Sequence, residues 1–220
     1  MRGGTFRDRI DRLLARDTAV ALAGGRPRLG FLGESEHTVA MATLPVSDYD
    51  EPLVTVEEYL HTSYRPDCDY VDGRIEERNV GEYDHGLLQS LLVHLFMSHR
   101  QEWGIRVVTD VRTQVSARRF RVPDLSVLRA DAPKEQIIAH PPLIAIEILS
   151  PEDRLSRFQE RIEDYLNFGV EHIWILDPER RSAHTASAAG LLPVRSSELT
   201  VPGTPIRVML SELFAELDRG

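Results

Sequence analysis

The segment Leu143–Leu149 (LIAIEIL) constrains the fold more than any other part of the chain. Six of its seven residues are apolar, as expected of a strand buried at the centre of a sheet. The one ionisable residue is Glu147, and acidic side chains are almost never fully buried without a partner. The sequence therefore predicts a central strand whose single carboxylate contacts a cation, a network of hydrogen-bond donors or a water-filled cleft.

The segments around this strand predict an α/β protein with a mixed sheet flanked by helices. Thr55 followed by Glu58 is typical of a helix start with a capping box, and Asp72-Gly73 is typical of a hairpin turn. A crossover helix is predicted to begin at Ser150 and Pro151 and to end at Gly169. The other predicted elements are a helix over His85–Arg100, a hairpin of Ile105–Val115 and Phe120–Leu128, a strand over His172–Leu176, a weak strand over Pro205–Met209 and a helix over Ser211–Leu217.

The chain of 220 residues divides near residue 50. Residues 1–50 contain two Gly-rich spots and little periodicity, so we expect a poorly ordered N-terminal extension. Alternatively, translation of the native protein starts at Met41. From residue 51 the hydrophobic pattern is that of a globular protein, and residues 51–220 have the ordinary size of one domain.

Asp124 is the second carboxylate whose position stands out. Strand alternation places Asp124 and Ser126 on one face of their strand, and Glu147 shares a face with Ala145. If the two strands are adjacent, the oxygens of Asp124 and Glu147 converge on one hard cation, and the small neighbours leave room for it. Equally, Glu147 could form a buried salt bridge with an arginine such as Arg161. Spacing alone does not separate these two interpretations.

Composition narrows the class of protein. A formal net charge of -9 argues against a protein that coats DNA without sequence preference, although metal-binding carboxylates add negative charge where cations bind. The single cysteine, Cys68, cannot form an internal disulfide, and no Cys/His cluster suggests structural zinc. No apolar run approaches the roughly 20 residues that cross a bilayer, and no secretory signal is evident, so we expect a cytoplasmic protein.

Several motifs together resemble those of a known family. They are Pro123–Val127 (PDLSV), Glu147–Pro151 (EILSP), Tyr165–Pro178 (YLNFGVEHIWILDP), Tyr70–Gly73 (YVDG), His85 at a helix start and Leu213-Phe214. The combination resembles the Uma-two family, which is described as restriction endonucleases with a PD-(D/E)XK nuclease fold. The resemblance covers about residues 52–217.

This resemblance implies a restriction-endonuclease-like fold and a metal-dependent endonuclease that hydrolyses DNA phosphodiester bonds. Asp124 and Glu147 match the family's two metal-binding acids, with the backbone carbonyl of Ile148 as a further ligand and Mg²⁺ or Mn²⁺ as the ion. The catalytic lysine of the family appears on the following helix, where the matching residue is Arg161. Arginine can grip a phosphate but does not give up a proton at neutral pH. Lys134 is the only lysine of the chain, so arginine at this position follows a general preference.

The alternative function is that of a catalytically impaired nuclease-fold protein that binds nucleic acid or a protein partner without cleavage. The sequence shows no interface, but cleavage of both strands of a duplex needs two sites, which a homodimer would supply. Four residues are candidates for substrate binding: His85, Gln89, Arg112 and Arg121. The alternatives are a helix-capping histidine and a solvated arginine face.

Overall fold

A computed structural model of the chain describes residues 53–79, 82–151, 153 and 155–219. The extension predicted over residues 1–50, and with it the alternative start at Met41, lies outside the described residues.

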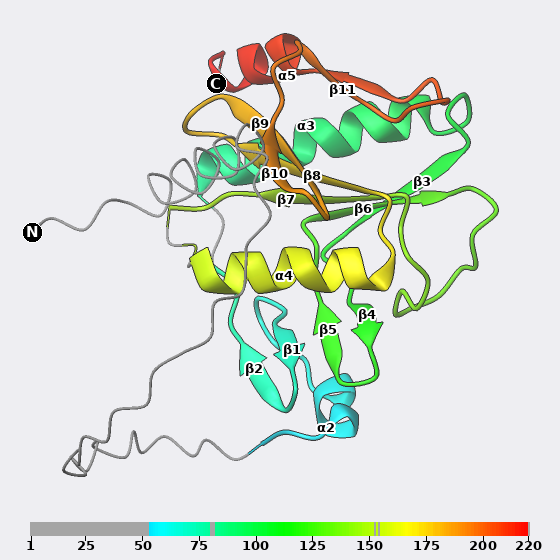
Figure 1. The fold of residues 1–220 in the computed structure, drawn as a ribbon, viewed down its shortest axis with the longest axis vertical. Helices are drawn as coiled ribbons and strands as arrows, with labels where there is room; N and C mark the ends of the chain where they lie inside the picture. The colour runs from blue at the N-terminus through cyan, green and yellow to red at the C-terminus, as the bar shows by residue number, and fades with distance from the viewer. Residues whose placement is uncertain (1–52, 80–81, 152, 154, 220) are drawn as a thin grey trace, which may run out of the picture.

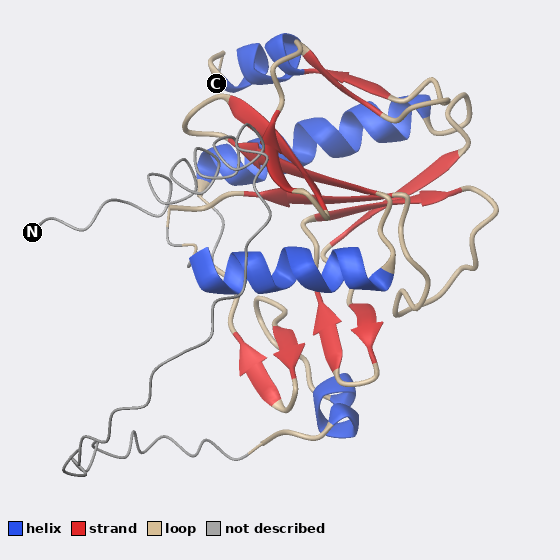
Figure 2. Ribbon diagram, in the orientation of Figure 1, coloured by secondary structure: helices blue, strands red, loops and turns tan. Residues whose placement is uncertain are grey.

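A six-stranded sheet forms the centre of the protein (Figures 1 and 2). In spatial order its strands are β10 (Gly190–Pro193), β9 (Ser182–Ser187), β8 (His172–Asp177), β7 (Ile144–Ile148), β6 (Leu125–Arg129) and β3 (Ile105–Thr109). β7 and β8 are parallel and are joined by helix α4 (Leu155–Phe168), whereas the other neighbours are antiparallel. The prediction of a mixed sheet with one crossover helix is therefore confirmed.

Helices cover both faces of this sheet, as Figure 1 shows. On one face lie α3 (Tyr83–His99) and α5 (Leu210–Leu217), and on the other lies α4. Residues one turn apart on α3 point into the first core, where they pack with the apolar side of β7 and β8. The side chains of this core include Leu88, Leu92, Phe96, Ile146 and Trp174. The second core joins α4 to the opposite side of the same strands and includes Phe158, Ile162, Tyr165, Ala145 and Ile173.

A smaller four-stranded sheet lies beyond α4 (Figure 2). Its strands, in spatial order, are β2 (Arg74–Glu76), β1 (Asp69–Val71), β5 (Arg119–Arg121) and β4 (Thr113–Ser116), with helix α2 (Val56–His61) beside them. The predicted capping box of Thr55 and Glu58 is present at the start of α2. The predicted turn between β1 and β2 is also present, with φ angles of 50° at Asp72 and 99° at Gly73.

The predicted hairpin of Ile105–Val115 and Phe120–Leu128 is divided between the two sheets. β4 pairs with β5 in the small sheet, and β3 pairs with β6 in the large one. The division lies where Asp110 adopts a φ of 53° and where Pro123, which has no N–H, cannot continue a ladder. This bend leaves Asp124 directly before β6, at the edge where the two sheets meet.

Two helix starts and three strands differ from the prediction. Helix α3 begins two residues before His85, and α4 begins at Leu155 rather than at Pro151. Helix α4 starts later because Ser150 and Asp153 form a turn. The backbone N–H of Asp153 donates to the carbonyl of Ser150, and the Asp153 carboxylate accepts the N–H of Ser150. Three strands were not predicted: β9, β10 and β11 (Glu198–Thr200).

The C-terminal elements are close to those predicted. β12 (Arg207–Met209) pairs with β11 in a two-stranded ribbon, and helix α5 follows directly. In the part of the chain that the structure describes, no helix has the length and apolar character needed to cross a membrane.

Candidate active site

Asp124 and Glu147 lie side by side on one face of the central sheet. β6 and β7 are adjacent and antiparallel, with Leu125 opposite Ile146 and Ser126 opposite Ala145. Continuing this register by one residue places Asp124 opposite Glu147. Their exposed fractions are only 3% and 2%. The expectation that the two acids belong to neighbouring strands and point to the same side is thus met by the strand register.

Glu147 is bound by two side chains of α4. Arg161 Nη1 donates to Glu147 Oε2 at 2.9 Å, and the Tyr165 hydroxyl donates to Oε1 at 2.6 Å. The buried salt bridge that the sequence left as one of two interpretations is therefore present. Burial nevertheless raises the pKa of Glu147 to about 7, although the Arg161 guanidinium acts in the opposite direction.

Asp124 is held by a different set of groups. The backbone N–H of Ile148 donates to Oδ2 at 2.7 Å, and His85 Nε2 lies 3.4 Å from the same oxygen. Arg78 donates from Nη2 to Oδ1 and from Nη1 to Asp110 at 3.1 Å. Burial alone would raise the pKa of Asp124, but Arg78 and His85 outweigh it and lower this pKa to about 2. The two neighbouring acids therefore have very different proton affinities.

A small cavity of about 30 Å³ lies between these groups. It is lined by Arg78, Asn79, His85, Asp124, Glu147, Ile148, Ser150, Asp153, Phe158 and Arg161. Its volume is enough for one small ligand, such as a water molecule. A wider groove of about 490 Å³ shares His85 and Ser150 with the cavity, so a larger molecule can approach the acids from that side.

The side chains present fit a hard divalent cation in their chemistry. Mg²⁺ prefers oxygen ligands and is usually held by one or two protein carboxylates, with water and substrate completing the shell. Asp124 and Glu147 are two such carboxylates at one cavity. Within the described residues, no three His, Cys, Asp or Glu side chains are already gathered around one point. An ion would compete for these oxygens with the guanidinium groups of Arg78 and Arg161.

The structure brings two of the four predicted substrate-binding residues to this site. His85 lines the cavity. Gln89 lies one turn further along α3 and donates from Nε2 to the backbone oxygen of Asp124 and to Asp110, both at 3.0 Å. It therefore supports the backbone at Asp124.

The other two arginines are held elsewhere. Arg112 pairs with Asp67 at 2.7 Å and lies over the ring of Tyr59, beside α2. Arg121 has no exposed surface and is bonded to carboxylates of β1 and α4, so it does not contact a molecule in the cavity. Arg112 and Arg121 of the hairpin thus stabilise the part of the protein around the small sheet.

Two side chains that bind the acids were not predicted. Arg78 follows β2 in a segment without a recognisable motif, and its contact with Asp124 spans 46 positions. Tyr165 begins the motif Tyr165–Pro178, but no role in the site was predicted for it. The signal that could have identified it is its spacing, because residues i and i+4 on a helix share a face and Tyr165 follows Arg161 by four.

Comparison with known proteins gives a family and a fold. The Uma2 (Uma-two) family model, described as "Putative restriction endonuclease", matches residues 56–207. Among solved structures, the chain resembles the crystal structure of "a putative nuclease belonging to DUF820" from Anabaena variabilis ATCC 29413. The TM-score is 0.65 with 21% sequence identity, over 74% of this chain and 99% of that one. At this identity the likeness shows the fold alone. No curated protein matches the chain.

Proposed function

The chain belongs to the Uma2 family, and from that membership and the geometry of the site we propose that it is a divalent-metal-dependent endonuclease acting on DNA phosphodiester bonds. The observation that carries the proposal is the meeting of Asp124, Glu147 and the helix-borne Arg161 at one cavity. Neither acid is apolar, so packing in a hydrophobic core does not explain why both side chains are buried.

Asp124 and Glu147 would hold the ion, Mg²⁺ or Mn²⁺, with the backbone carbonyl of Ile148 as a further ligand. When bound, such an ion polarises the phosphodiester and makes a neighbouring water molecule more acidic. The residues of the chain supply the remaining requirements. Ile148 N–H fixes one oxygen of Asp124, and the Tyr165 hydroxyl fixes one oxygen of Glu147, so both carboxylates are oriented in advance.

Arg161 would bind the phosphate. Its guanidinium keeps its charge, because the carboxylates around it raise its pKa well above the ordinary value despite burial. A guanidinium can donate two hydrogen bonds to phosphate oxygens and stabilise the charge that develops during hydrolysis. It does not act as a general base. His85 at the cavity wall is proposed as a second contact with substrate, and Gln89 acts through the backbone of Asp124.

The alternative is a nuclease-fold protein that binds nucleic acid or a protein partner without cleaving it. The observation in its favour is that both acids are already neutralised by arginines, at 2.9 Å for Arg161 and Glu147 and through a direct bond for Arg78 and Asp124. It predicts binding that neither requires metal nor leads to hydrolysis. A homodimer is part of the first proposal only if both strands of a duplex are cut.

The deciding experiment is a cleavage assay with Mg²⁺ or Mn²⁺ on plasmid DNA, single-stranded DNA and RNA. The parent is compared with Glu147→Ala, Arg161→Lys and the exposed control Glu171→Gln, whose carboxylate pairs with Arg129 at the surface. We expect metal-dependent cleavage by the parent and the control, and none by Glu147→Ala. Full activity of Glu147→Ala would show that the site is wrong. Activity in Arg161→Lys that the parent lacks would favour the alternative.

A further inference from the structure

Arg161 is held at two of its nitrogens. Nη1 donates to Glu147 at 2.9 Å, and Nε donates to Asp69 Oδ2 at 3.2 Å. No described residue accepts a hydrogen bond from Nη2, and the side chain, which is 14% exposed, lines the cavity. The guanidinium is therefore fixed in its plane while one of its nitrogens remains available to a molecule in the cavity.

Asp69 joins this arginine to the smaller sheet. It lies on β1 with no exposed surface, 92 positions from Arg161. Its Oδ1 accepts the backbone N–H of Val122 at 2.9 Å, and its Oδ2 accepts Arg121 Nη1 at 3.1 Å as well as Arg161 Nε. Burial would raise the pKa of Asp69, but Arg161 and Arg121 hold it below its usual value. The aspartate is thus a buried anion with every oxygen engaged.

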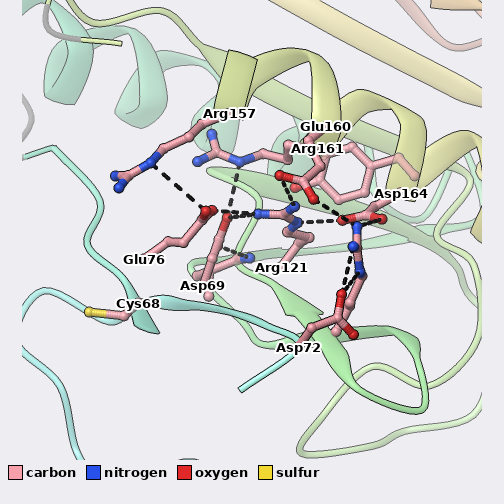
Figure 3. A network of polar contacts seen from close by, with 12 residues as sticks. Cys68, Asp69, Asp72, Glu76, Arg121, Arg157, Glu160, Arg161 and Asp164 are labelled. Carbon is pink, nitrogen blue, oxygen red and sulfur yellow. Dashed lines mark hydrogen bonds and ion pairs between the residues drawn. The ribbon is translucent and has the colours of Figure 1, made fainter. Parts of the chain in front are cut away.

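Arg121 in turn is anchored on several sides (Figure 3). Its Nε donates to Asp164 of α4 at 2.7 Å, and its Nη1 donates to Glu76 of β2 at 3.0 Å. Asp164 is one turn beyond Arg161 on the same helix, so the path from Arg161 through Asp69 and Arg121 returns to α4. A closed set of contacts between α4 and the small sheet therefore fixes the position of Asp69.

Stability alone does not account for such a network. The desolvation of buried charges offsets most of their attraction, and apolar side chains of similar volume are often equally stabilising. What a charged network supplies instead is defined geometry, because a guanidinium bonded through Nε cannot rotate about its own long side chain. That geometry is directed at the cavity, since Arg161 is the member that reaches it.

We propose that Asp69 is a positioning residue for Arg161, holding the guanidinium so that it meets the phosphate of a bound substrate, with Arg121 and Asp164 keeping Asp69 in place. The proposal rests on the nuclease function proposed above. Asp69 does not touch the substrate, so its effect passes through Arg161. The smaller sheet then has a role in the chemistry in addition to its role in the fold.

The kinetic test compares Asp69→Asn, which keeps the shape and removes the charge, with Asp72→Asn. Asp72 lies on the same hairpin and pairs with Arg119 at 2.6 Å, but it does not contact Arg161. We expect kcat of Asp69→Asn to fall by about 100-fold, the cost of a small misplacement of a catalytic group, while KM changes little. Asp72→Asn should cleave like the parent. In an Arg161→Ala background, Asp69→Asn should cause no further loss, because the two residues act as one unit.

A second readout does not depend on cleavage. The Nε–H of Arg161 is identified in a ¹H–¹⁵N spectrum of the full chain by its loss in Arg161→Lys, and its exchange with solvent is measured. Asp69→Asn should speed this exchange and shift the signal, whereas Asp72→Asn should not. If the parent cleaves no nucleic acid, the nuclease proposal fails and this spectrum still decides whether Asp69 positions Arg161.

An unchanged Arg161 signal in Asp69→Asn, or equal losses of activity in the Arg161→Ala background and the parent, would overturn the proposal. Thermal unfolding is recorded for each variant. If Asp69→Asn does not fold, Asp69→Glu takes its place, because it keeps the charge that Arg121 and Arg161 require and displaces the carboxylate by one methylene. It should show the same changes in kcat and in Nε–H exchange, and their absence would equally refute the positioning role.

Discussion

Binding of Mn²⁺ should release protons in an amount that depends on pH. The pKa of Glu147 is raised to about 7 and that of Asp124 is lowered to about 2. A metal ion binds the ionised carboxylate, so the proton of Glu147 must leave when the ion enters. With a pKa of about 7, about 0.9 proton leaves Glu147 at pH 6 and about 0.1 at pH 8. Asp124 is ionised at both values and contributes none.

The same numbers fix the change in affinity. The ionised fraction of Glu147 rises from about 0.1 to about 0.9 over these two pH units, so the apparent Kd for Mn²⁺ should fall about tenfold, or about 1.4 kcal/mol. The direction follows from the raised pKa, since protons compete with the ion below pH 7 and not above it. Isothermal titration calorimetry in buffers of different ionisation enthalpy measures both the affinity and the number of protons released.

His85 is one group at the cavity that could imitate this result. It lies 3.4 Å from Asp124, and its bond to that carboxylate raises its pKa against the effect of burial, so it too can lose a proton when a cation arrives. The two arginines at the cavity keep their charge throughout. We therefore expect His85→Asn to retain the pH-dependent release and Glu147→Gln to lose Mn²⁺ binding. Equal affinity at pH 6 and pH 8, or loss of the release in His85→Asn, would refute the reasoning.

Four further substitutions test other parts of the structure. Arg78→Ala should lower the stability of the metal-free protein by about 3 kcal/mol in urea denaturation, because Asp124 loses a buried partner, yet it should enlarge the rise in Tm caused by Mn²⁺. Arg121→Ala should cost about 4 kcal/mol by the same assay, since it removes a fully buried guanidinium that pairs with both Asp69 and Asp164 and leaves each of them a single arginine partner; a loss below about 1 kcal/mol would contradict the burial argument. Gly73→Ala should cost about 1–3 kcal/mol, because φ is 99° there and a Cβ would lie 3.1 Å from Leu53. Arg161→Lys should cost about 2 kcal/mol, because one ammonium cannot reproduce both carboxylate contacts, and unchanged unfolding would show that it can.

The central part of the site could be predicted because its signals are local. A single acid in an apolar strand and the alternation of side chains along β6 and β7 identify Glu147 and Asp124 without knowledge of the fold. Arg161 could be predicted once the family resemblance supplied the position on the helix. The helix and strand order was likewise predictable where apolar residues recur at the period of one element, as Phe158, Ile162 and Tyr165 do in α4.

The contacts that complete the site are not local. Arg78 reaches Asp124 across 46 positions and Asp69 reaches Arg161 across 92, and no pattern in the sequence connects them. The same limit explains why Arg112 and Arg121 of the hairpin were predicted to bind substrate although the structure holds them elsewhere. Alternation places Arg119 and Arg121 on one face, but only the packing of α4 against that face makes Arg121 a buried residue. Strand β9 was missed because Ser182–Ser187 lacks bulky β-branched residues and forms a strand by pairing with β8.

The position of Arg161 also bears on whether an arginine there signals a lost activity. If arginine had replaced lysine at this position without consequence for function, its side chain would be expected to make few specific contacts. Arg161 is instead bonded through Nε to Asp69 and through Nη1 to Glu147, two contacts that require the geometry of a guanidinium. The surroundings therefore match the arginine that is present, because a lysine nitrogen already engaged by Glu147 would leave Asp69 without one of its three donors. This complementarity favours a site built around arginine, in which Arg161 binds charge and proton transfer belongs to other groups.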